Sequence, residues 1–431
     1  MPEYKKKRRN RLFSPHPRSR AVTRRLGDKS EDIVMTPEGK EKTVKAPKNA
    51  NMKVVKGKKE EKKRKFKVFT AFVIAVCVLL IVLEIVFPAG LIRTVKNTVA
   101  VIGSGSLPIE LDSTNTLDVK PMGNYYFLLS NTHLYAYSNS GKELINYIHG
   151  CEKPILKVSR WGALIFDQGD TKLSVLTISG EETFVDTKKT VISAAIADTG
   201  SYAVVTESDS YASAVTVYNK KGKSIYEWYS AKDTVNNVAI SSNAKKIAVS
   251  TFNTSGGEFS STVNVLNFES ATPEYTYKIE DSLVYDISSA ATGYFTVASS
   301  NSMQFIKWSN YKRNDYKNDY SLLMLRTASH GTVAVWGRES NLNDNIITVF
   351  SKNGEKDYEF KFNGIISDIR LFGGNIYCMS DTDIFLLSDT GKTLRKASSG
   401  FGGVKIVVSG TSNVLVATDN KIEKIKLEEE N

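Results

Sequence analysis

One pattern recurs through most of the chain: a strand-like run, a polar turn, and a second strand-like run. It occurs at Leu134 to Tyr147, Val215 to Trp228, Ile347 to Phe360 and Ile384 to Ala397, each time with glycine at the bend. Glycine accepts the positive φ that the turn of a hairpin needs. Because a single hairpin is barely stable in water, its regular recurrence predicts a repeat architecture whose units are stable only together.

Short apolar runs mark the repeat, and their spacing averages about 41 residues. They begin at eight positions: Tyr126, Ala163, Tyr202, Ile247, Phe295, Val333, Ile376 and Leu415. Each run is almost continuously apolar, as expected for a strand that is covered on both faces. One strand-like segment precedes each run, and a second apolar strand and a more polar, alternating strand follow most of them.

Four strands in each repeat of about 41 residues predict the blade of a β-propeller. The fold class is therefore all-β, a single eight-bladed propeller, with seven blades as the alternative. Two stacked β-sandwiches would give turn signals at strand spacing but no register of 41 residues. The eighth unit ends without a fourth strand, whereas Ser106 to Asp112 precedes the first unit without a blade of its own. Pairing the two would cover an open edge, so we expect one domain over 106–431.

Positive charge is concentrated at the N-terminus. Residues 1–67 contain 24 Lys and Arg against 8 Asp and Glu, and the remainder of the chain contains 34 against 38. The nearly neutral body argues against nucleic acid as its partner. Residues 1–67 are polar and poor in large apolar side chains, which predicts a disordered tail. Its basic residues could serve topology alone, on anionic lipid, or could dock on an acidic partner or nucleic acid at the membrane.

A transmembrane helix is predicted over 68–92. Val68 to Leu83 carries no charge, and after Glu84 the apolar character resumes as far as Ile92. About 20 such residues span a bilayer, and the apolar residues outweigh the cost of one carboxylate near the far end. A cleaved signal peptide is the alternative, but it would begin much closer to the N-terminus and would end in a better cleavage site.

The orientation of this span follows from the basic residues beside it. Lys56 to Lys67 is rich in lysine and precedes the span directly, whereas only Arg93 and Lys96 follow closely. The positive-inside rule then places the N-terminus in the cytoplasm and the propeller outside the plasma membrane. We expect residues 93–105 to be a linker.

The turns that end in Gly-Lys and lead into an aromatic-rich strand, as in Val217 to Trp228, resemble the repeats of PQQ-type and WD40-like propellers. With the basic tail and the single span, the whole layout resembles a family of membrane-anchored β-propellers of unknown function from Firmicutes. The resemblance covers residues 68–431 as architecture, and it implies fold and topology only, because propellers serve many functions.

No enzyme motif is present. The sequence lacks a G-x-S-x-G elbow, an H-E-x-x-H helix and a phosphate-binding loop. The pairs Asp167 with Asp170 and Asp381 with Asp383 lie at strand ends, where aspartate commonly serves turns. The inner strands offer mostly Ser, Ala, Val and Ile. We therefore expect no metal and no cofactor, and we read Cys151 and Cys378 as small buried side chains, although a disulfide between them is the alternative.

The sequence favours a non-enzymatic binding or scaffolding module of the cell envelope; the alternative is a hydrolase or quinoprotein with its site at the channel. Three connections between second and third strands are expanded, over Glu207 to Ala214, Phe252 to Ser261 and Gly337 to Asn345, and should share one rim. Expanded loops on a rigid scaffold often bind partners, although tolerated insertion explains them equally. Candidate partner-binding residues are Tyr211, Phe259 and Arg338, which are types favoured in interfaces.

Overall fold

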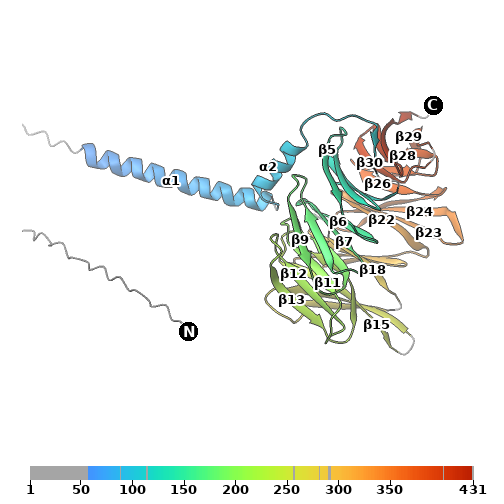
Figure 1. The fold of residues 1–431 in the computed structure, drawn as a ribbon, viewed down its shortest axis with the longest axis horizontal. Coiled ribbons are helices and arrows are strands. Elements are labelled where there is room, and N and C mark those ends of the chain that lie inside the picture. Colours follow the sequence, from blue (N-terminus) through green and yellow to red (C-terminus); the bar gives the residue numbers. More distant parts are fainter. Residues whose placement is uncertain are drawn as a thin grey trace, which may run out of the picture. The chain divides into compact units, whose positions relative to one another are not determined.

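A computed structural model describes residues 57–429 apart from 88, 113, 114, 256, 257, 281, 290–292 and 401. Two helices precede the strands: α1 (Gly57–Val86) and α2 (Leu91–Ala100). All remaining elements are strands, and Figure 1 follows them in sequence colours around the propeller. The strands form eight sheets, each of four or five strands, so the eight-bladed β-propeller is confirmed.

The first four blades take consecutive strands from the innermost to the outermost. Blade 1 contains β2 (Thr116–Pro121), β3 (Tyr125–Ser130), β4 (His133–Ser138) and β5 (Glu143–Ile148). Blade 2 contains β6 (Pro154–Val158), β7 (Ala163–Asp167), β8 (Lys172–Leu176) and β9 (Glu182–Asp186). Blade 3 contains β10 (Val191–Ile196), β11 (Tyr202–Thr206), β12 (Ser213–Tyr218) and β13 (Ser224–Ser230). Blade 4 contains β14 (Thr234–Ile240), β15 (Lys246–Ser255), β16 (Glu258–Asn267) and β17 (Tyr275–Glu280).

The next blades repeat this order. Blade 5 contains β18 (Val284–Ser289), β19 (Tyr294–Ser299), β20 (Ser302–Lys307) and β21 (Arg313–Lys317). Blade 6 contains β22 (Ser321–Ala328), β23 (Gly331–Arg338), β24 (Asn341–Ser351) and β25 (Lys356–Asn363). Blade 7 contains β26 (Asp368–Phe372), β27 (Asn375–Met379), β28 (Asp383–Leu387) and β29 (Thr393–Ser398). Blade 8 takes β30 (Lys405–Gly410), β31 (Asn413–Ala417) and β32 (Lys421–Lys426) from the end of the chain.

The ring closes by sharing the last blade between the two ends of the propeller. β1 (Ile109–Glu110) pairs antiparallel with β32, with Ile109 opposite Ile422, and so supplies the missing fourth strand of blade 8. The predicted closure by the segment that contains Ser106 to Asp112 is therefore confirmed. A further short strand, β33 (Glu428–Glu429), was not predicted and pairs with the outer strand of blade 7.

Apolar side chains on both faces of the middle strands form the core. Every residue of β3 is buried, because one side packs on blade 2 and the other on blade 8. Phe127 and Leu129 join the cluster that reaches blade 2, whereas Tyr126 and Leu128 join the cluster that reaches blade 8. A blade therefore buries its faces only against its neighbours, which is the physical reason for the repeated hairpin. Gly222, at the bend of the β12–β13 hairpin, has the expected positive φ of 76°.

The boundaries ahead of the propeller need three corrections. Residues 1–56 of the predicted basic tail lie outside the described residues, but 57–67 are helical and belong to α1. The predicted span over 68–92 is not one helix, because α1 ends at Val86 and α2 begins at Leu91. The predicted linker over 93–105 is largely the helix α2, which packs on the propeller.

Candidate functional site

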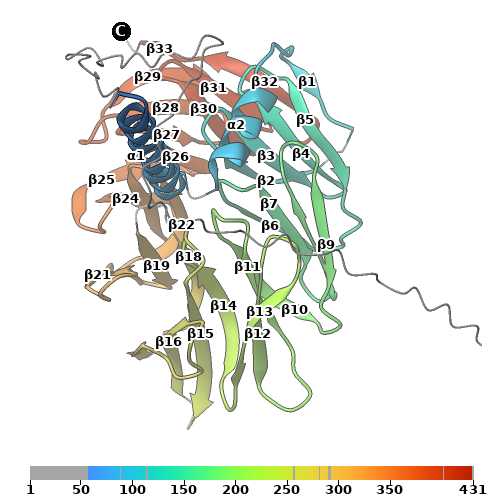
Figure 2. The ribbon, with the colours of Figure 1, turned by 90° about the vertical axis from the view of Figure 1, so that its left-hand side faces the viewer.

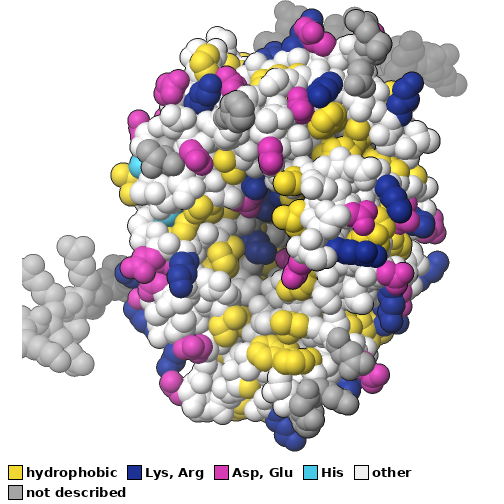
Figure 3. Space-filling view, turned by 90° about the vertical axis from the view of Figure 1, so that its right-hand side faces the viewer, with side chains coloured by type: hydrophobic (Ala, Val, Ile, Leu, Met, Phe, Trp, Pro, Cys, Tyr) yellow, Lys and Arg dark blue, Asp and Glu magenta, His cyan; other side chains and the backbone are white. Residues whose placement is uncertain are grey.

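The propeller has two faces that differ in their connections. Neighbouring strands of a blade are antiparallel, so successive connections alternate between the faces. Turns between first and second strands, and between third and fourth strands, lie on the face that carries α2, which we call the α2 face (Figure 2). Connections between second and third strands, and between successive blades, lie on the other, which we call the hairpin face (Figure 3).

The connections of the two faces also differ in charge. On the α2 face they contain nine Lys and Arg against six Asp and Glu, a net charge of +3. On the hairpin face the described connection residues contain four Lys and Arg against ten Asp and Glu, a net charge of −6. The connections of the two faces therefore create electrostatic surfaces of opposite sign.

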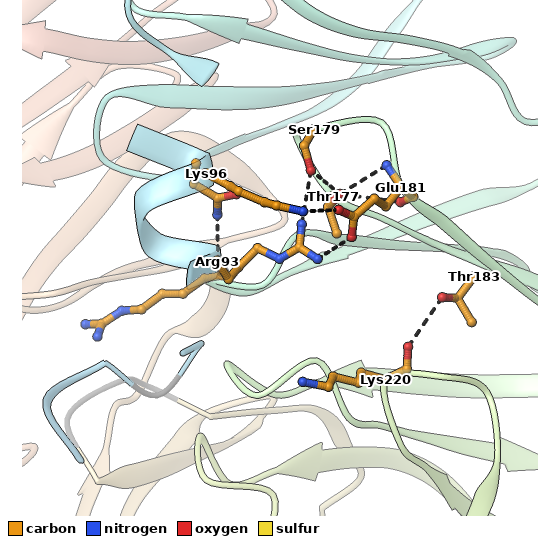
Figure 4. A network of polar contacts seen from close by, with 9 residues as sticks. Arg93, Lys96, Thr177, Ser179, Glu181, Thr183 and Lys220 are labelled. Carbon is orange, nitrogen blue, oxygen red and sulfur yellow. Dashed lines mark hydrogen bonds and ion pairs between the residues drawn. The ribbon is translucent and has the colours of Figure 1, made fainter. Parts of the chain in front are cut away.

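α2 is fixed to blade 2 by charged side chains. Arg93 and Lys96 lie one turn apart on the helix, and both are directed at Glu181 in the turn between β8 and β9 (Figure 4). The distance from Lys96 Nζ to Glu181 Oε1 is 2.8 Å, and Arg93 Nη2 pairs with the other carboxylate oxygen. Arg93 Nη1 also donates to Ser179 Oγ at 3.1 Å. The hydrogen bonds from Lys96 and Arg93 to Glu181 lower the pKa of its carboxyl to about 2.

Trp161 provides the surface on which α2 rests. It lies in the turn between β6 and β7, is almost fully buried, and has the Arg93 guanidinium 4.3 Å from its ring centre. Gly200 of blade 3 approaches this ring so closely that a side chain there would collide with it. Asn97 Nδ2, on the same side of α2, donates to the carbonyl of Arg160 at 3.2 Å. A buried arginine stacked on tryptophan indicates a specific seat for the helix.

Blade 1 holds the C-terminal end of the same helix. Lys142, in the turn between β4 and β5, donates through Nζ to the carbonyls of Ala100 and Ile102, both at 2.7 Å. Lysine often satisfies the last carbonyls of a helix in this way and interacts favourably with the helix dipole. Ser140 Oγ donates to the carbonyl of Gly103 at 3.1 Å. Both ends of α2 are therefore bonded to the propeller.

The hairpin face carries the three predicted expansions, all of which connect second to third strands. Two of them are not loops as predicted. β15 and β16 continue their pairing out to Thr254 opposite Phe259 and beyond, and β23 and β24 leave only two residues between them. Continued main-chain pairing makes these projections stiffer than loops. Residues 207–212, between β11 and β12, are a true connection.

The three candidate partner-binding residues are exposed on these projections. Phe259 is 60% exposed, and Tyr211 is 47% exposed and packs on Tyr229 with ring centres 4.9 Å apart. Arg338 lies with its guanidinium 4.6 Å from the ring centre of Tyr320. They belong to blades 4, 3 and 6 respectively, so they form a row along one part of the rim and not a single cluster.

The central channel opens as a hollow on the hairpin face, with Lys and Arg side chains inside it (Figure 3). The expectation that the inner strands are mostly Ser, Ala, Val and Ile is wrong for β2, β6, β22 and β26, and six of the eight inner strands carry charged side chains. These strands carry five basic and three acidic residues, namely Lys120, Lys157, Arg326, Arg370 and Lys405 with Asp118, Asp286 and Asp368. Charged residues within short apolar strands, as in the sequence DIRLF of β26, were the available signal.

Most of these charges join blades to one another. Asp368 is fully buried and accepts from Arg326 Nη2 at 3.0 Å, from Arg370 Nη2 at 2.8 Å and from the amide of Ile406 at 3.1 Å. Arg370 also donates to the carbonyls of Val119 and Ile406. The inner strands of blades 6, 7, 8 and 1 are thereby connected beside the closure of the ring.

The pKa shifts of the channel residues agree with a role in joining the blades. Burial lowers the pKa of Arg370 against the opposing effect of Asp368, and burial likewise lowers the pKa of Lys405. Burial acts to raise the pKa of Asp118, but Lys120 and the two arginines hold it below its usual value. Lys157 and Asp286 form an ion pair at 3.7 Å between blades 2 and 5.

Asp167, Cys151 and Cys378, which were singled out from the sequence, occupy structural positions in the propeller. Asp167 accepts from the amides of Glu152 and Lys153, at 2.7 and 2.8 Å, and so shapes a turn. Cys151 and Cys378 are both free, and Cys378 is buried. Among the described residues, no three His, Cys, Asp or Glu side chains are placed to hold a metal ion.

Residues 104–427 match the model of a protein family described as a family of unknown function (DUF5711). The chain belongs to this family. No curated protein sequence is significantly similar to it.

Two solved structures are similar to this chain, and only the first of them has a TM-score above 0.5. The C-terminal WD40 domain of Sif2 is 9% identical, covers 76% of this chain and 100% of its own, and has a TM-score of 0.52. BamB from Moraxella catarrhalis is 15% identical, covers 75% of this chain and 99% of its own, and has a TM-score of 0.49. The WD40-like character of this member of the family is thus confirmed as fold, whereas a PQQ-type character stays a prediction.

Proposed function

We propose that this member of the family is a single-pass, membrane-anchored binding module of the cell envelope, whose propeller lies outside the plasma membrane and binds a partner on its hairpin face. The anchor is a 19-residue stretch of α1, Lys65–Leu83, with a mean hydropathy of 2.8. This length fits one crossing of a bilayer. The lysine-rich residues that precede it favour a cytoplasmic N-terminus.

One observation carries the choice of binding face. α2 occupies the α2 face through bonds to blades 1 and 2, whereas the opposite face projects stiff hairpins with exposed Phe259 and Arg338. Exposed aromatic and arginine side chains are typical binding anchors. Tyr211 and Arg338 already stack on rings of the propeller, so a partner would lose little side-chain entropy in ordering them.

The charged channel favours a structural role over catalysis. Asp368 and Arg370 are bonded to one another and to the main chain of neighbouring inner strands. A general acid, base or nucleophile would need a free lone pair or proton directed at a substrate. The partner is therefore expected to be a protein or another envelope component that meets the hairpin face.

Site-specific photocrosslinking in intact cells tests this function. A photoreactive phenylalanine analogue replaces Tyr211 or Phe259 on the hairpin face, and Lys221 serves as the matched control because it is an exposed turn residue on the α2 face. We expect a discrete adduct at positions 211 and 259 that is missing at 221. Absence of any adduct at all hairpin positions, or the same adducts at 221, would contradict the proposed face.

Protease treatment of cells without their wall tests the topology. Protease added outside should digest the propeller and spare an epitope in residues 1–56. A protected propeller with a digested N-terminus would reverse the assignment.

A further inference from the structure

α2 has its polar and apolar sides reversed relative to an ordinary surface helix. Helices on globular proteins normally turn their apolar stripe to the core and their polar side to water. In α2 the polar Arg93 and Asn97 are buried against the propeller. Ile92, Val95 and Val99 are 76%, 52% and 59% exposed.

The exposed residues form one continuous stripe. Ile92, Val95 and Val99 are spaced by three and four residues, so they lie on one side of the helix. Ile102, just beyond the C-terminal end, extends the stripe and is 66% exposed. Arg93 and Asn97 occupy the opposite side. An exposed apolar stripe of this kind indicates that a surface other than the propeller buries it.

The position of α2 in the chain limits which surface can bury this stripe. Only residues 87–90 separate α2 from α1. Even a fully extended connection of this length reaches no more than roughly 18 Å. The apolar stretch of α1 ends at Leu83. The start of α2 must therefore remain close to the boundary between headgroups and acyl chains.

The charge of the connections around α2 favours the same lipid surface. The connections on the α2 face have a net charge of +3, and three of the lysines, Lys220, Lys221 and Lys223, share the turn between β12 and β13. Interfacial helices combine a buried apolar side with nearby basic residues that face anionic headgroups. The described connections of the hairpin face, with a net charge of −6, lack this complementarity.

We infer that α2 is an interfacial helix, whose stripe of Ile92, Val95, Val99 and Ile102 lies in the outer surface of the bilayer while Arg93, Lys96 and Asn97 fix the propeller to it. The inference rests on the proposed membrane anchor. The lipid surface is thus joined to blades 1 and 2, and the α2 face is turned toward the membrane.

Cysteine labelling of the full chain in anionic lipid vesicles tests this inference. The variants Val99→Cys and Asp209→Cys place a thiol on the stripe and on the hairpin face, and both sites are exposed in the protein itself. The native cysteines give little background outside the span, because Cys378 is buried and the pKa of Cys151 is raised to about 11 by burial. Cys77, within the apolar stretch, reports separately on the anchor.

The expected result is a rate of labelling by a water-soluble maleimide that is about tenfold or more lower at Val99→Cys than at Asp209→Cys, each relative to its rate in unfolded protein. Equal rates with an unlabelled Cys77 would overturn the interfacial helix and leave the anchor intact. A labelled Cys77 would refute the anchor itself. Protection of Val99→Cys together with a disulfide between two copies under mild oxidation would show that a second chain covers the stripe, which also overturns the inference.

Discussion

The α2 face and the hairpin face are built by the same strands, yet their connections differ in length and in charge. On the α2 face the connections are turns with a net positive charge, and Trp161, Lys142 and Glu181 on them hold a helix. On the hairpin face two strand pairs are prolonged and the described connections have a net negative charge. Blade packing fixes the strands, whereas each set of connections is free to serve its own surface.

From this contrast we expect the two faces to tolerate insertions differently. A turn on the α2 face touches its neighbours, as Gly200 does with Trp161. A prolonged hairpin projects away from the ring and ends in exposed residues such as Phe259. Lengthening a connection costs little loop-closure entropy, so the free face can acquire projections more easily than the face that must seat α2.

The largest effect on stability is expected from removing an ion pair between the inner strands, which support both faces. Asp368→Ala should lower the free energy of unfolding by about 3 to 5 kcal/mol, because it leaves Arg370 and Arg326 without the carboxylate that compensates them. Thermal melting of the full chain, followed by tryptophan fluorescence, measures this loss of stability. Asp315→Ala is the matched control, since the Arg313 to Asp315 pair is half-exposed and should contribute about 1 kcal/mol or less. Equal losses in the two variants would contradict the structural role of the channel charges.

An intermediate effect is expected at the seat of α2. Glu181→Gln removes the charge that Arg93 and Lys96 share, and it should weaken the docking of α2 by about 1 kcal/mol because the carboxylate is half-exposed. Hydrogen exchange of the α2 amides measures the docking. Glu182→Gln is the neighbouring control, because Glu182 is the first residue of β9 and accepts hydrogen bonds from Tyr147 and Ser174 of blades 1 and 2. If both variants exchange like the native chain, the ion pairs do not hold the helix.

The same seat should respond to acid. The pKa of Glu181 is lowered to about 2 in the folded chain, from an ordinary value of 4.5. Its contribution is therefore fully present above about pH 4.5 and is lost as the pH falls through about 2. Exchange of the α2 amides, corrected for its intrinsic pH dependence, should rise in this window in the native chain. Glu181→Gln should remove this particular rise; an identical rise in that variant would assign it to other groups.

The smallest effect on stability is expected on the hairpin face. Replacing Tyr211, Phe259 and Arg338 together by Ala should change the melting temperature little, because exposed substitutions of this kind usually cost about 0.5 kcal/mol or less each. The same variant should lose the photocrosslinked partner. A large loss of stability would mean that these residues support the fold, and retention of the partner would place the site elsewhere.

The ring of blades could be predicted from the sequence because the signals for its strands are local. Apolar runs at a regular spacing predict the strands, and the unpaired segment that contains Ile109 predicts the closure. The seat of α2 was missed, since Arg93 and its partner Glu181 are separated by most of two blades in sequence. The spacing of Ile92, Val95 and Val99 was the available signal for a helix, although not for the surface that it meets.

The channel charges show a second limit of sequence. The charged residues of the inner strands are visible in the sequence, but their pattern does not tell which of them meet across neighbouring blades. The pairing of Asp368 with Arg326 depends on where two blades meet. The prolonged hairpins were taken for loops because their polar residues, such as Asn253 and Ser260, pair through the main chain and leave no apolar pattern.

The most direct test of the account measures the distance of each face from the membrane. Dyes at Lys221→Cys and Asp209→Cys lie at opposite ends of blade 3, separated by roughly the 20 Å length of a six-residue strand. Energy transfer to an acceptor on lipid headgroups is then compared for the full chain in vesicles. We expect clearly stronger transfer from position 221, on the α2 face. Equal transfer, or stronger transfer from position 209, would contradict a propeller whose α2 face is turned toward the membrane.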